Sequence, residues 1–260
     1  MLVSISRIHS NDSEVDLNRE FEVGVRGGLG YRGDDRFSEA LKNYKTYSGT
    51  GLYGNTDVSP FHYTKNLEAY ARTRWSTSMK VGFMVGNSTF QKFRLEEFNS
   101  LPEITRINFQ FSSGYLLLSF HKEWFYKKWI LEGGILLGVN NTELNPSGFT
   151  INRFGYTELN GFMTANGLSY RLEFGVKRKI SESYYWETGL SATMHTAPYF
   201  SGSFNDTLGS YYIKTDGSLE LLTNSQFKES AAYTEIASRR LDMVYSVLQI
   251  YLGLAKRFSL

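Results

Sequence analysis

Residues 129–140 read WILEGGILLGVN, and the order of apolar and polar side chains in this stretch decides the fold. One set of alternate positions carries large apolar side chains, namely Trp129, Leu131, Ile135, Leu137 and Val139. The other set carries small or polar residues, namely Glu132, Gly134, Gly138 and Asn140. A period of two is the spacing at which a β-strand sends successive side chains to opposite faces. The stretch therefore predicts a strand with one apolar face and one polar face.

The same alternation recurs along the chain. It is clear in residues 21–31, 168–177, 184–195 and 248–258, and weaker in residues 63–75, 79–91 and 104–121. Aromatic residues make up 16% of the chain and glycine occurs 24 times, a composition that suits pleated and bent strands. With residues 129–140 the count of predicted strands is eight. We predict an all-β chain that forms a single domain over residues 1–260, an antiparallel up-and-down β-barrel.

The strand at 104–121 changes its apolar register part-way. Large apolar residues fall on odd positions up to Phe111 and on even positions from Leu116, with the sequence SSG at 112–114 between them. One extra residue in a strand produces this shift. We therefore expect a β-bulge at 112–114.

The connections between the predicted strands alternate in length. Short turns are expected near residues 76–78, 123–128 and 180–183, and long polar loops at about 32–62, 92–103, 141–163 and 196–240. Outer-membrane barrels have short periplasmic turns and long extracellular loops, whereas a soluble sandwich or lipocalin-like barrel has no reason to sort its loops by end. The pattern favours a transmembrane barrel with the polar segment 1–19 in the periplasm. A soluble ligand-binding barrel stays open as an alternative.

Tryptophan placement points the same way. All four tryptophans lie at or beside the predicted short turns, namely Trp75, Trp124, Trp129 and Trp186. An indole ring is apolar but its N–H needs a polar partner, so tryptophan prefers the boundary between lipid and water. We expect these four residues to be membrane-interface anchors.

Composition excludes several other classes of protein. The 260 residues carry 28 basic and 26 acidic side chains, a formal net charge of +2, which does not favour a nucleic-acid-binding protein. The chain has no cysteine, so a disulfide scaffold or a thiolate metal site is excluded. No apolar run reaches the roughly 18 residues of a transmembrane helix. The N-terminal 20 residues are too polar for a signal peptide.

Three motifs carry a resemblance to a known group. They are EVGVRGGLGYRG at 22–33, LEFGVKRKIS at 172–181 and IYLGLAKRF at 250–258. Together they resemble the small outer-membrane β-barrels of Bacteroidota, the PorT-like group. The resemblance implies a place in the bacterial outer membrane, contact with its lipids and lipopolysaccharide, and protein partners in larger outer-membrane complexes.

The last of these motifs is similar to the C-terminal signal that barrel-assembly machinery recognises. The resemblance assigns Gly253 and the aromatic Phe258 to that signal and implies the assembly machinery as a partner during insertion. The motif departs from the pattern because Lys256 stands at a usually apolar position and Ser259 and Leu260 follow the aromatic residue.

The polar faces of the predicted strands carry many charges. Twelve of them are expected inside the barrel as an ion-pair network: Glu22, Arg26, Glu68, Arg72, Arg74, Lys80, Glu132, Arg171, Glu173, Lys177, Glu187 and Arg257. The interior of an eight-stranded barrel is just wide enough for side chains to fill, and buried charges must be paired. We expect this network to plug the lumen; a proton or ion path along it is the alternative.

A catalytic site has little support in the sequence. His62 and His195 are predicted near the long-loop rim, where a histidine with nearby hydroxyl groups could serve a lipid-modifying hydrolase. No Ser/His/acid spacing accompanies them, although Ser191 lies four residues before His195 on the same face. Four scattered histidines make no metal-binding cluster, and no cofactor is expected.

The long loops suggest binding as the function. The segments NYKTYSGTGLYGN (43–55) and TAPYFSGSFND (196–206) are rich in Tyr, Gly, Ser and Asn, a mix that suits adaptable contacts. We predict a non-enzymatic accessory or scaffold subunit of an outer-membrane assembly, secretion or uptake complex. A lipid-modifying enzyme and a narrow channel are the alternatives within the same fold.

Overall fold

The computed structural model describes residues 20–33, 57–58, 62–99, 103–205, 207–214, 219–223, 237–240 and 242–259. These residues contain no helix, and so none long and apolar enough to cross a membrane. Of the expected segments, residues 1–19, most of 32–62 and part of 196–240 lie outside the described residues.

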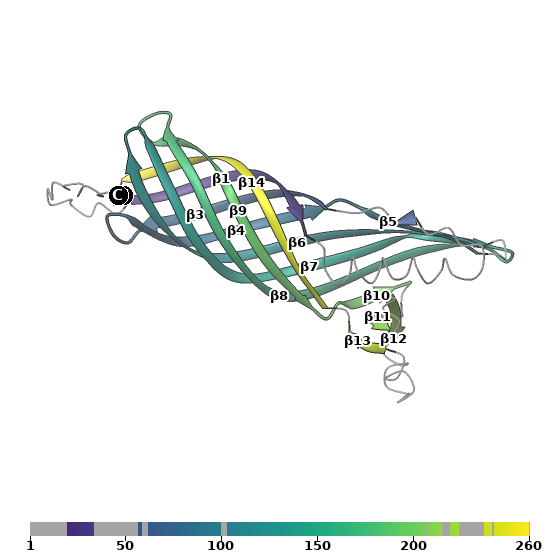
Figure 1. Cartoon of the computed structure of the whole chain (residues 1–260). Coiled ribbons are helices and arrows are strands. Elements are labelled where there is room, and N and C mark those ends of the chain that lie inside the picture. Colours follow the sequence, from purple (N-terminus) through teal and green to yellow (C-terminus); the bar gives the residue numbers. More distant parts are fainter. Residues whose placement is uncertain are drawn as a thin grey trace, which may run out of the picture.

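Eight long strands form the body of the molecule (Figure 1). They are β1 (Glu20–Arg32), β3 (Tyr63–Arg74), β4 (Met79–Phe90), β6 (Glu103–Tyr126), β7 (Trp129–Asn152), β8 (Gly155–Lys179), β9 (Tyr184–Pro198) and β14 (Asp242–Ser259). Each pairs antiparallel with the next, and β14 pairs with both β9 and β1, so the sheet closes into a ring. This confirms the predicted eight-stranded antiparallel barrel.

The short turns lie at one end of the barrel. The start of β1 and the end of β14 lie at the same end. The turns comprise residues 75–78, 127–128 and 180–183, and Glu20 of β1 lies opposite Ser259 of β14 at the same end. The turn predicted at 123–128 was too long. Residues 123–126 stay paired with 129–132, and Lys127, with φ of 54°, closes a two-residue turn.

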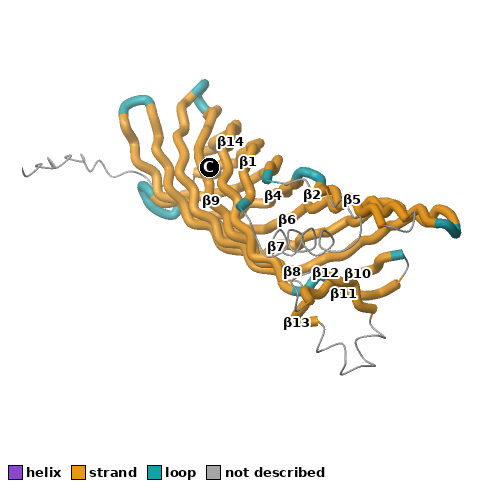
Figure 2. The backbone as a smooth tube through the Cα atoms, turned by 45° about the vertical axis from the view of Figure 1, so that its right-hand side comes forward, coloured by secondary structure: helices purple, strands orange, loops and turns teal. Residues whose placement is uncertain are grey.

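At the other end, two of the predicted loops are strands. The segment 141–163 continues β7 and β8 to a tight turn at Arg153 and Phe154, and 92–103 forms β5 (Phe93–Asn99) with the start of β6. We call residues 103–113, 141–152 and 155–166 the tongue. Figures 1 and 2 show it extending well beyond the barrel. The loop predictions for 92–103 and 141–163 were therefore wrong in local structure.

The remaining short strands join the same sheet. β2 (Asp57–Val58) pairs with β5, and β10 (Ser201–Phe204) pairs with β8. β11 (Thr207–Lys214) pairs with β10, β12 (Leu219–Thr223) and β13 (Ala237–Arg240). The loop predicted at 196–240 thus contains the end of β9 and four short strands among its described residues.

The bulge expected at 112–114 is absent. Ser112, Ser113 and Gly114 pair in unbroken register with both β4 and β7. Instead, the apolar residues change sides: Phe111 points inward and is buried, whereas Leu116 points outward and is exposed. Below this level the barrel wall is apolar and the interior polar. Above it the interior is mainly apolar: Phe111 packs edge to face against the buried Phe200 at a ring separation of 6.2 Å, and the buried Arg32 lies over the Phe111 ring.

Candidate functional site

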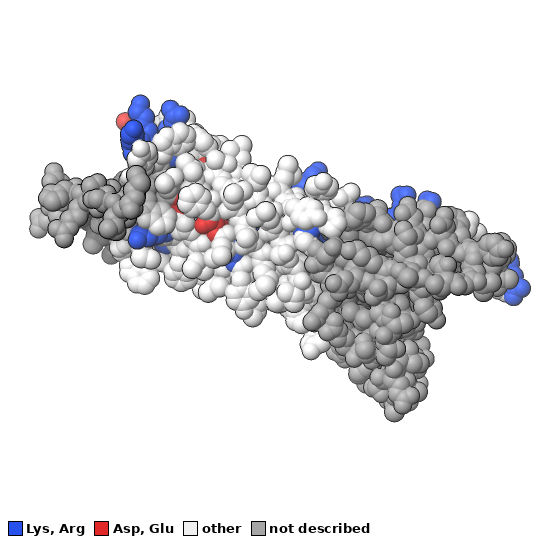
Figure 3. All heavy atoms as spheres, viewed as in Figure 1, with Lys and Arg blue, Asp and Glu red and all other residues white. Residues whose placement is uncertain are grey.

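The outer wall of the barrel is apolar over a belt of constant height. On β7 the outward-facing side chains run from Trp129 to Val139, and on β9 from Trp186 to Met194. These spans match the roughly 9–11 residues with which a tilted strand crosses a bilayer. Figure 3 shows the corresponding wide zone as mostly uncharged, with few Lys, Arg, Asp or Glu atoms at its surface and a group of Lys and Arg at the turn end.

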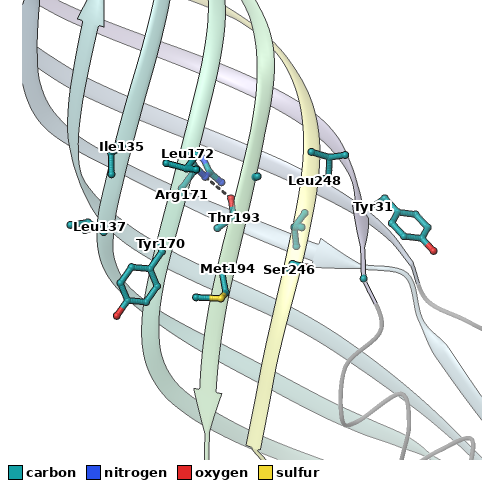
Figure 4. Close-up of a pocket in the computed structure, with 13 residues that line it drawn as sticks. Tyr31, Ile135, Leu137, Tyr170, Arg171, Leu172, Thr193, Met194, Ser246 and Leu248 are labelled. Carbon is teal, nitrogen blue, oxygen red and sulfur yellow. Dashed lines mark hydrogen bonds between the residues drawn. The ribbon is translucent and has the colours of Figure 1, made fainter.

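The change of face along one strand is visible in Figure 4. On β8, Leu172 is 60% exposed on the outer wall, whereas its neighbour Arg171 is 2% exposed and donates a hydrogen bond from Nε to Thr193 Oγ1 of β9 at 2.7 Å. An open pocket of about 600 Å³ lies on this outer wall, lined mostly by apolar side chains such as Met194 and Leu248. It belongs to the apolar belt.

The four tryptophans lie at the turn end. Trp75 stands in the 75–78 turn and Trp124 near the end of β6, both exposed. Trp129 and Trp186 pack edge to face, with ring centroids 5.7 Å apart. Their position at the lower edge of the belt is the one that an interfacial role requires.

The C-terminal motif lies where strands β1 and β14 meet. Phe258 lies opposite Phe21, with ring centroids 6.4 Å apart. Lys256, the departure from the apolar pattern, extends over the rings of Tyr184 and Phe258 at 5.2 and 4.8 Å. Its stem covers apolar surface while its ammonium group stays at the edge of the belt. Gly253 packs closely against the Arg26 side chain and the Val25 carbonyl of the neighbouring strand.

The interior near the turns is an ion-pair cluster centred on Glu22. This fully buried carboxylate pairs with Lys80, Lys177 and Arg257 at 2.6, 2.5 and 2.7 Å. A second carboxylate, Glu123, pairs with Arg257 at 2.5 Å and with Lys80 at 3.0 Å. The cluster therefore joins β1, β4, β6, β8 and β14 across the full width of the barrel.

Arg74 lies at the periphery of this cluster, nearer the opening. It pairs with Glu20 at 2.6 Å and with Glu123 at 3.5 Å, and its side chain is 16% exposed. Sequence reasoning missed Glu20 and Glu123. Glu123 would have been found had β6 been extended to its true end, because it lies on the same face as Ser119 and His121.

A second layer lies higher in the barrel. Arg26 pairs with Glu68 at 2.8 Å and with Glu173 at 2.5 Å, and Arg171 pairs with the same two carboxylates at 2.7 and 3.3 Å. Tyr115 donates its hydroxyl hydrogen to Glu68 at 2.5 Å. The two guanidinium groups and two carboxylates thus form a closed ring of four ion pairs.

The two layers are linked through the residues between them. Arg72 pairs with Glu132, and Lys177 reaches Glu132 at 2.6 Å and Glu187 at 3.5 Å. Tyr70 donates a hydrogen bond to Glu187 at 2.8 Å. The structure thus brings all twelve predicted charges together in one interior network.

Among the residues that the structure describes, the network is balanced in charge. Its seven cations are Arg26, Arg72, Arg74, Lys80, Arg171, Lys177 and Arg257, and its seven anions are Glu20, Glu22, Glu68, Glu123, Glu132, Glu173 and Glu187. His121, which the sequence reasoning also missed, contacts Glu173 at 3.1 Å. Equal numbers of opposite charges remove the cost that a single unpaired charge would carry in a low-dielectric interior.

The two histidines singled out in the sequence lie apart. His62 is half-buried; its Nδ1 lies 3.0 Å from the Arg32 carbonyl oxygen, and its ring stacks on Tyr31 on the outer wall. His195 lies inside, with Nδ1 2.7 Å from Ser169 Oγ. Ser191, the hydroxyl residue noted beside His195, points to a lower level, opposite Glu173.

Ser169 and His195 are placed like a nucleophile and its general base, but they lack the solvent access and the orienting acid of a catalytic site. Both residues are at most 1% exposed. The His195 ring is stacked on Tyr245, with centroids 5.0 Å apart, and Asn140 Nδ2 donates to Ser169 Oγ at 3.0 Å. An acyl substrate needs access to the serine, and a general base needs an orienting acid. The pair is packed as part of the core above the ion pairs.

Across the part of the chain that the structure describes, no group of three or more His, Asp or Glu side chains is arranged to hold a metal ion.

The closed ring, the apolar belt and the sorting of short turns to one end give the chain the build of a bacterial outer-membrane β-barrel. No protein-family model and no curated protein matches the sequence.

Solved structures do resemble it. Ail, the attachment invasion locus protein of Yersinia pestis in complex with the heparin analogue sucrose octasulfate, has a TM-score of 0.38 at 12% identity, over 93% of this chain and 99% of that one. The outer-membrane protein OprG from Pseudomonas aeruginosa has a TM-score of 0.39 at 11% identity, over 93% and 97%. The outer-membrane protease OmpT from Escherichia coli has a TM-score of 0.46 at 8% identity, over 94% and 98%. At these values the likenesses carry no argument about activity, and the fold rests on the strand pairing described above.

Proposed function

We propose that this chain is a non-enzymatic, non-conducting outer-membrane β-barrel that acts as an accessory or scaffold subunit of a larger outer-membrane assembly, secretion or uptake complex. The proposed kinship with the small PorT-like barrels of Bacteroidota rests on the three quoted motifs. Outer-membrane lipids, lipopolysaccharide and, during insertion, the barrel-assembly machinery are its other proposed partners.

One observation carries the proposal: the tongue presents an apolar row to water. Ile104, Ile151 and Tyr156 are cross-strand neighbours on β6, β7 and β8, and all three are exposed on the outer face. Phe149 stacks on Tyr156 with ring centroids 5.7 Å apart. Exposed apolar patches on an aqueous surface mark protein interaction sites.

The row is separate from the lipid-facing belt. Above Val139 the outward-facing residues of β7 turn polar, beginning with Asn141 and Glu143, before Phe149 and Ile151 appear. At about 3.4 Å per residue, Ile151 lies roughly 40 Å along the strand from Val139. Lipid therefore does not account for the exposed row, whereas a protein partner outside the membrane does.

The interior network supports the non-conducting part of the proposal. The network side chains are buried except for Glu20, Arg74 and Arg257, which lie nearest the turn end. A conducting pore needs a hydrated path, which these two layers of paired charges occupy. In planar bilayers we expect no steady conductance, with a porin as the positive control. A stable ohmic step would favour the channel alternative.

The accessory role is tested by co-purification in mild detergent from native membranes. We expect defined protein partners with the unaltered chain, and their loss with the double variant Ile151→Ser/Tyr156→Ser. Thr157→Ala is the matched control, because Thr157 is exposed on the same hairpin but on its other face. Recovery of a lone monomer from native membranes would contradict the proposal.

A further inference from the structure

A cavity of about 620 Å³ opens at the turn end of the barrel, between the β6–β7 turn and the β8–β9 turn. We call it the rim cavity. We propose that it binds the phosphate headgroup of an anionic phospholipid from the periplasmic leaflet. The inference is independent of the accessory role, since it needs no protein partner.

Four cations line the rim cavity: Lys127 and Lys128 from the β6–β7 turn, and Arg178 and Lys179 from the end of β8. Within the described residues none of them forms a salt bridge, whereas every cation of the interior network does. Like charges gathered in one place repel each other unless a counter-ion joins them. The arrangement is therefore complementary to an anion that the protein itself does not supply.

The nearby carboxylates do not fill this role. Glu182 lies exposed in the β8–β9 turn but is not part of the lining of the rim cavity. Arg257 reaches the inner wall of the cavity, but Glu22 and Glu123 already hold its guanidinium group at 2.7 and 2.5 Å. We therefore expect the anion to bind the four cations of the β6–β7 turn and the end of β8, and not Arg257.

Much of the remaining lining of the rim cavity is apolar. Phe125, Trp129 and Ile130 line it, and Arg178 extends over the Trp129 ring at 5.2 Å. Trp129 also packs against Trp186 at the lower edge of the lipid-facing belt. A ligand here meets cations on one side and aromatic surface on the other.

Cations beside an aromatic wall favour a phospholipid over a free inorganic anion. A free phosphate ion would use the cations and leave the aromatic wall unoccupied. A phospholipid places its phosphate between Lys128 and Arg178 and its glycerol and first acyl carbons against Trp129. Short turns face the periplasm in outer-membrane barrels, so the lipid comes from the inner leaflet. Basic pockets at the edge of a membrane-spanning surface are suited to anionic headgroups.

Native mass spectrometry of the full chain in detergent tests the proposal. Phosphatidylglycerol and phosphatidylcholine with the same acyl chains are titrated, and we expect tighter binding of phosphatidylglycerol. For Lys128→Gln/Arg178→Gln we expect affinity for phosphatidylglycerol to fall roughly 30-fold, since each basic group near an anionic lipid contributes about a factor of five. The charge-conserving variant Arg178→Lys should retain the preference.

The matched control removes two other cations from the same rim. Lys122 and Lys256 point outward over Trp124 and Tyr184 and do not line the rim cavity. Lys122→Gln/Lys256→Gln should leave the affinity for phosphatidylglycerol unchanged. Equal losses in the two double variants, or equal affinity of the unaltered chain for both lipids, would overturn the site.

The source of the phosphate is tested separately. Sodium phosphate added at constant ionic strength should not release bound phosphatidylglycerol, because the ion lacks the apolar part. Its release by phosphate but not by chloride would overturn the lipid assignment. Heat-modifiable migration in gel electrophoresis checks that each variant is folded.

Discussion

The carboxylate of Glu22 connects four strands through its hydrogen bonds. It belongs to β1 and accepts hydrogen bonds from Lys80 of β4, Lys177 of β8 and Arg257 of β14. We expect Glu22→Gln to lower the free energy of unfolding by about 3–5 kcal/mol, because breaking a buried ion pair leaves its partners uncompensated. Urea unfolding in detergent micelles measures the loss.

Glu158→Gln is the control for this measurement. Glu158 is exposed on the tongue, so its substitution should change the free energy of unfolding by no more than about 0.5 kcal/mol. Similar losses for the two variants would show that the interior cluster contributes no more than a surface charge.

Gly138 is a position where the barrel has no room for a side chain. A Cβ atom there would lie 1.9 Å from the backbone oxygen of Leu116 on the neighbouring strand. We expect Gly138→Ala to destabilise the barrel by about 1–3 kcal/mol, as overpacking does. Gly114→Ala is the matched strand control, since a Cβ at Gly114 would meet nothing within 4 Å. Unfolding midpoints of the two variants that coincide would refute the close approach.

Individual residues also show which features of the site can be predicted from the sequence alone. The twelve interior charges were assigned to the correct face because alternation fixes the face without knowledge of which strands meet. The contact between Ser169 and His195 was not foreseen, since it joins two strands through a register that one sequence does not reveal. His121 lies on the inward face that the apolar residues Leu118 and Phe120 imply, and it was missed because only Glu, Arg and Lys were assigned to the interior.

At the scale of elements, the tongue explains the main errors of prediction. A strand in lipid is apolar outside and polar inside, whereas a strand above the membrane follows the opposite rule. On β7, Leu137 points outward and is exposed, whereas Leu144 points inward and is fully buried. Met163 on β8 also points inward and is fully buried. The hydrophobic face therefore changes sides along one continuous strand. This change was taken for a bulge on β6 and for a polar loop on β7 and β8.

The segment 196–206 shows the same error on a smaller scale. Its Tyr, Gly and Ser content indicated a contact surface, yet Ala197 and Phe200 are fully buried. Phe200 packs on Phe111 in the apolar core above the ion pairs. Composition identifies a segment outside the membrane but not the side chains that it buries.

The tongue hairpin is expected to be separable from the barrel. Joining Ser147 to Asn160, which are paired on β7 and β8, through an Asn-Gly turn would remove Phe149, Ile151 and Tyr156 from the apolar row and keep the pairing of β8 with β10. We expect the shortened chain to keep heat-modifiable migration, because the interior network lies entirely below the cut. Co-purifying partners should be lost. An unfolded product would show instead that the hairpin is needed for the barrel itself.

At the scale of the whole molecule, we expect the barrel to take one orientation, with the short turns in the periplasm and the tongue outside the cell. The chain has no cysteine, so single cysteines report position without background. We expect a membrane-impermeant maleimide on intact cells to label Phe154→Cys, at the tip of the tongue, where the side chain is 83% exposed. Lys128→Cys, in the β6–β7 turn, should react only after the outer membrane is permeabilised. The reverse pattern would invert the topology.

The charge cluster at the base of the barrel also bears on how the molecule is assembled. Glu22 lies near the start of the first strand, and Arg257 lies near the end of the last. A sheet that contains the other strands but not β14 lacks Arg257, so its described inward-facing network carries an excess of one negative charge. Completion of the ring cancels that excess in one step. Closure of the barrel and neutralisation of its interior are therefore coupled, because without β14 the carboxylates of Glu22 and Glu123 lack one of their cations.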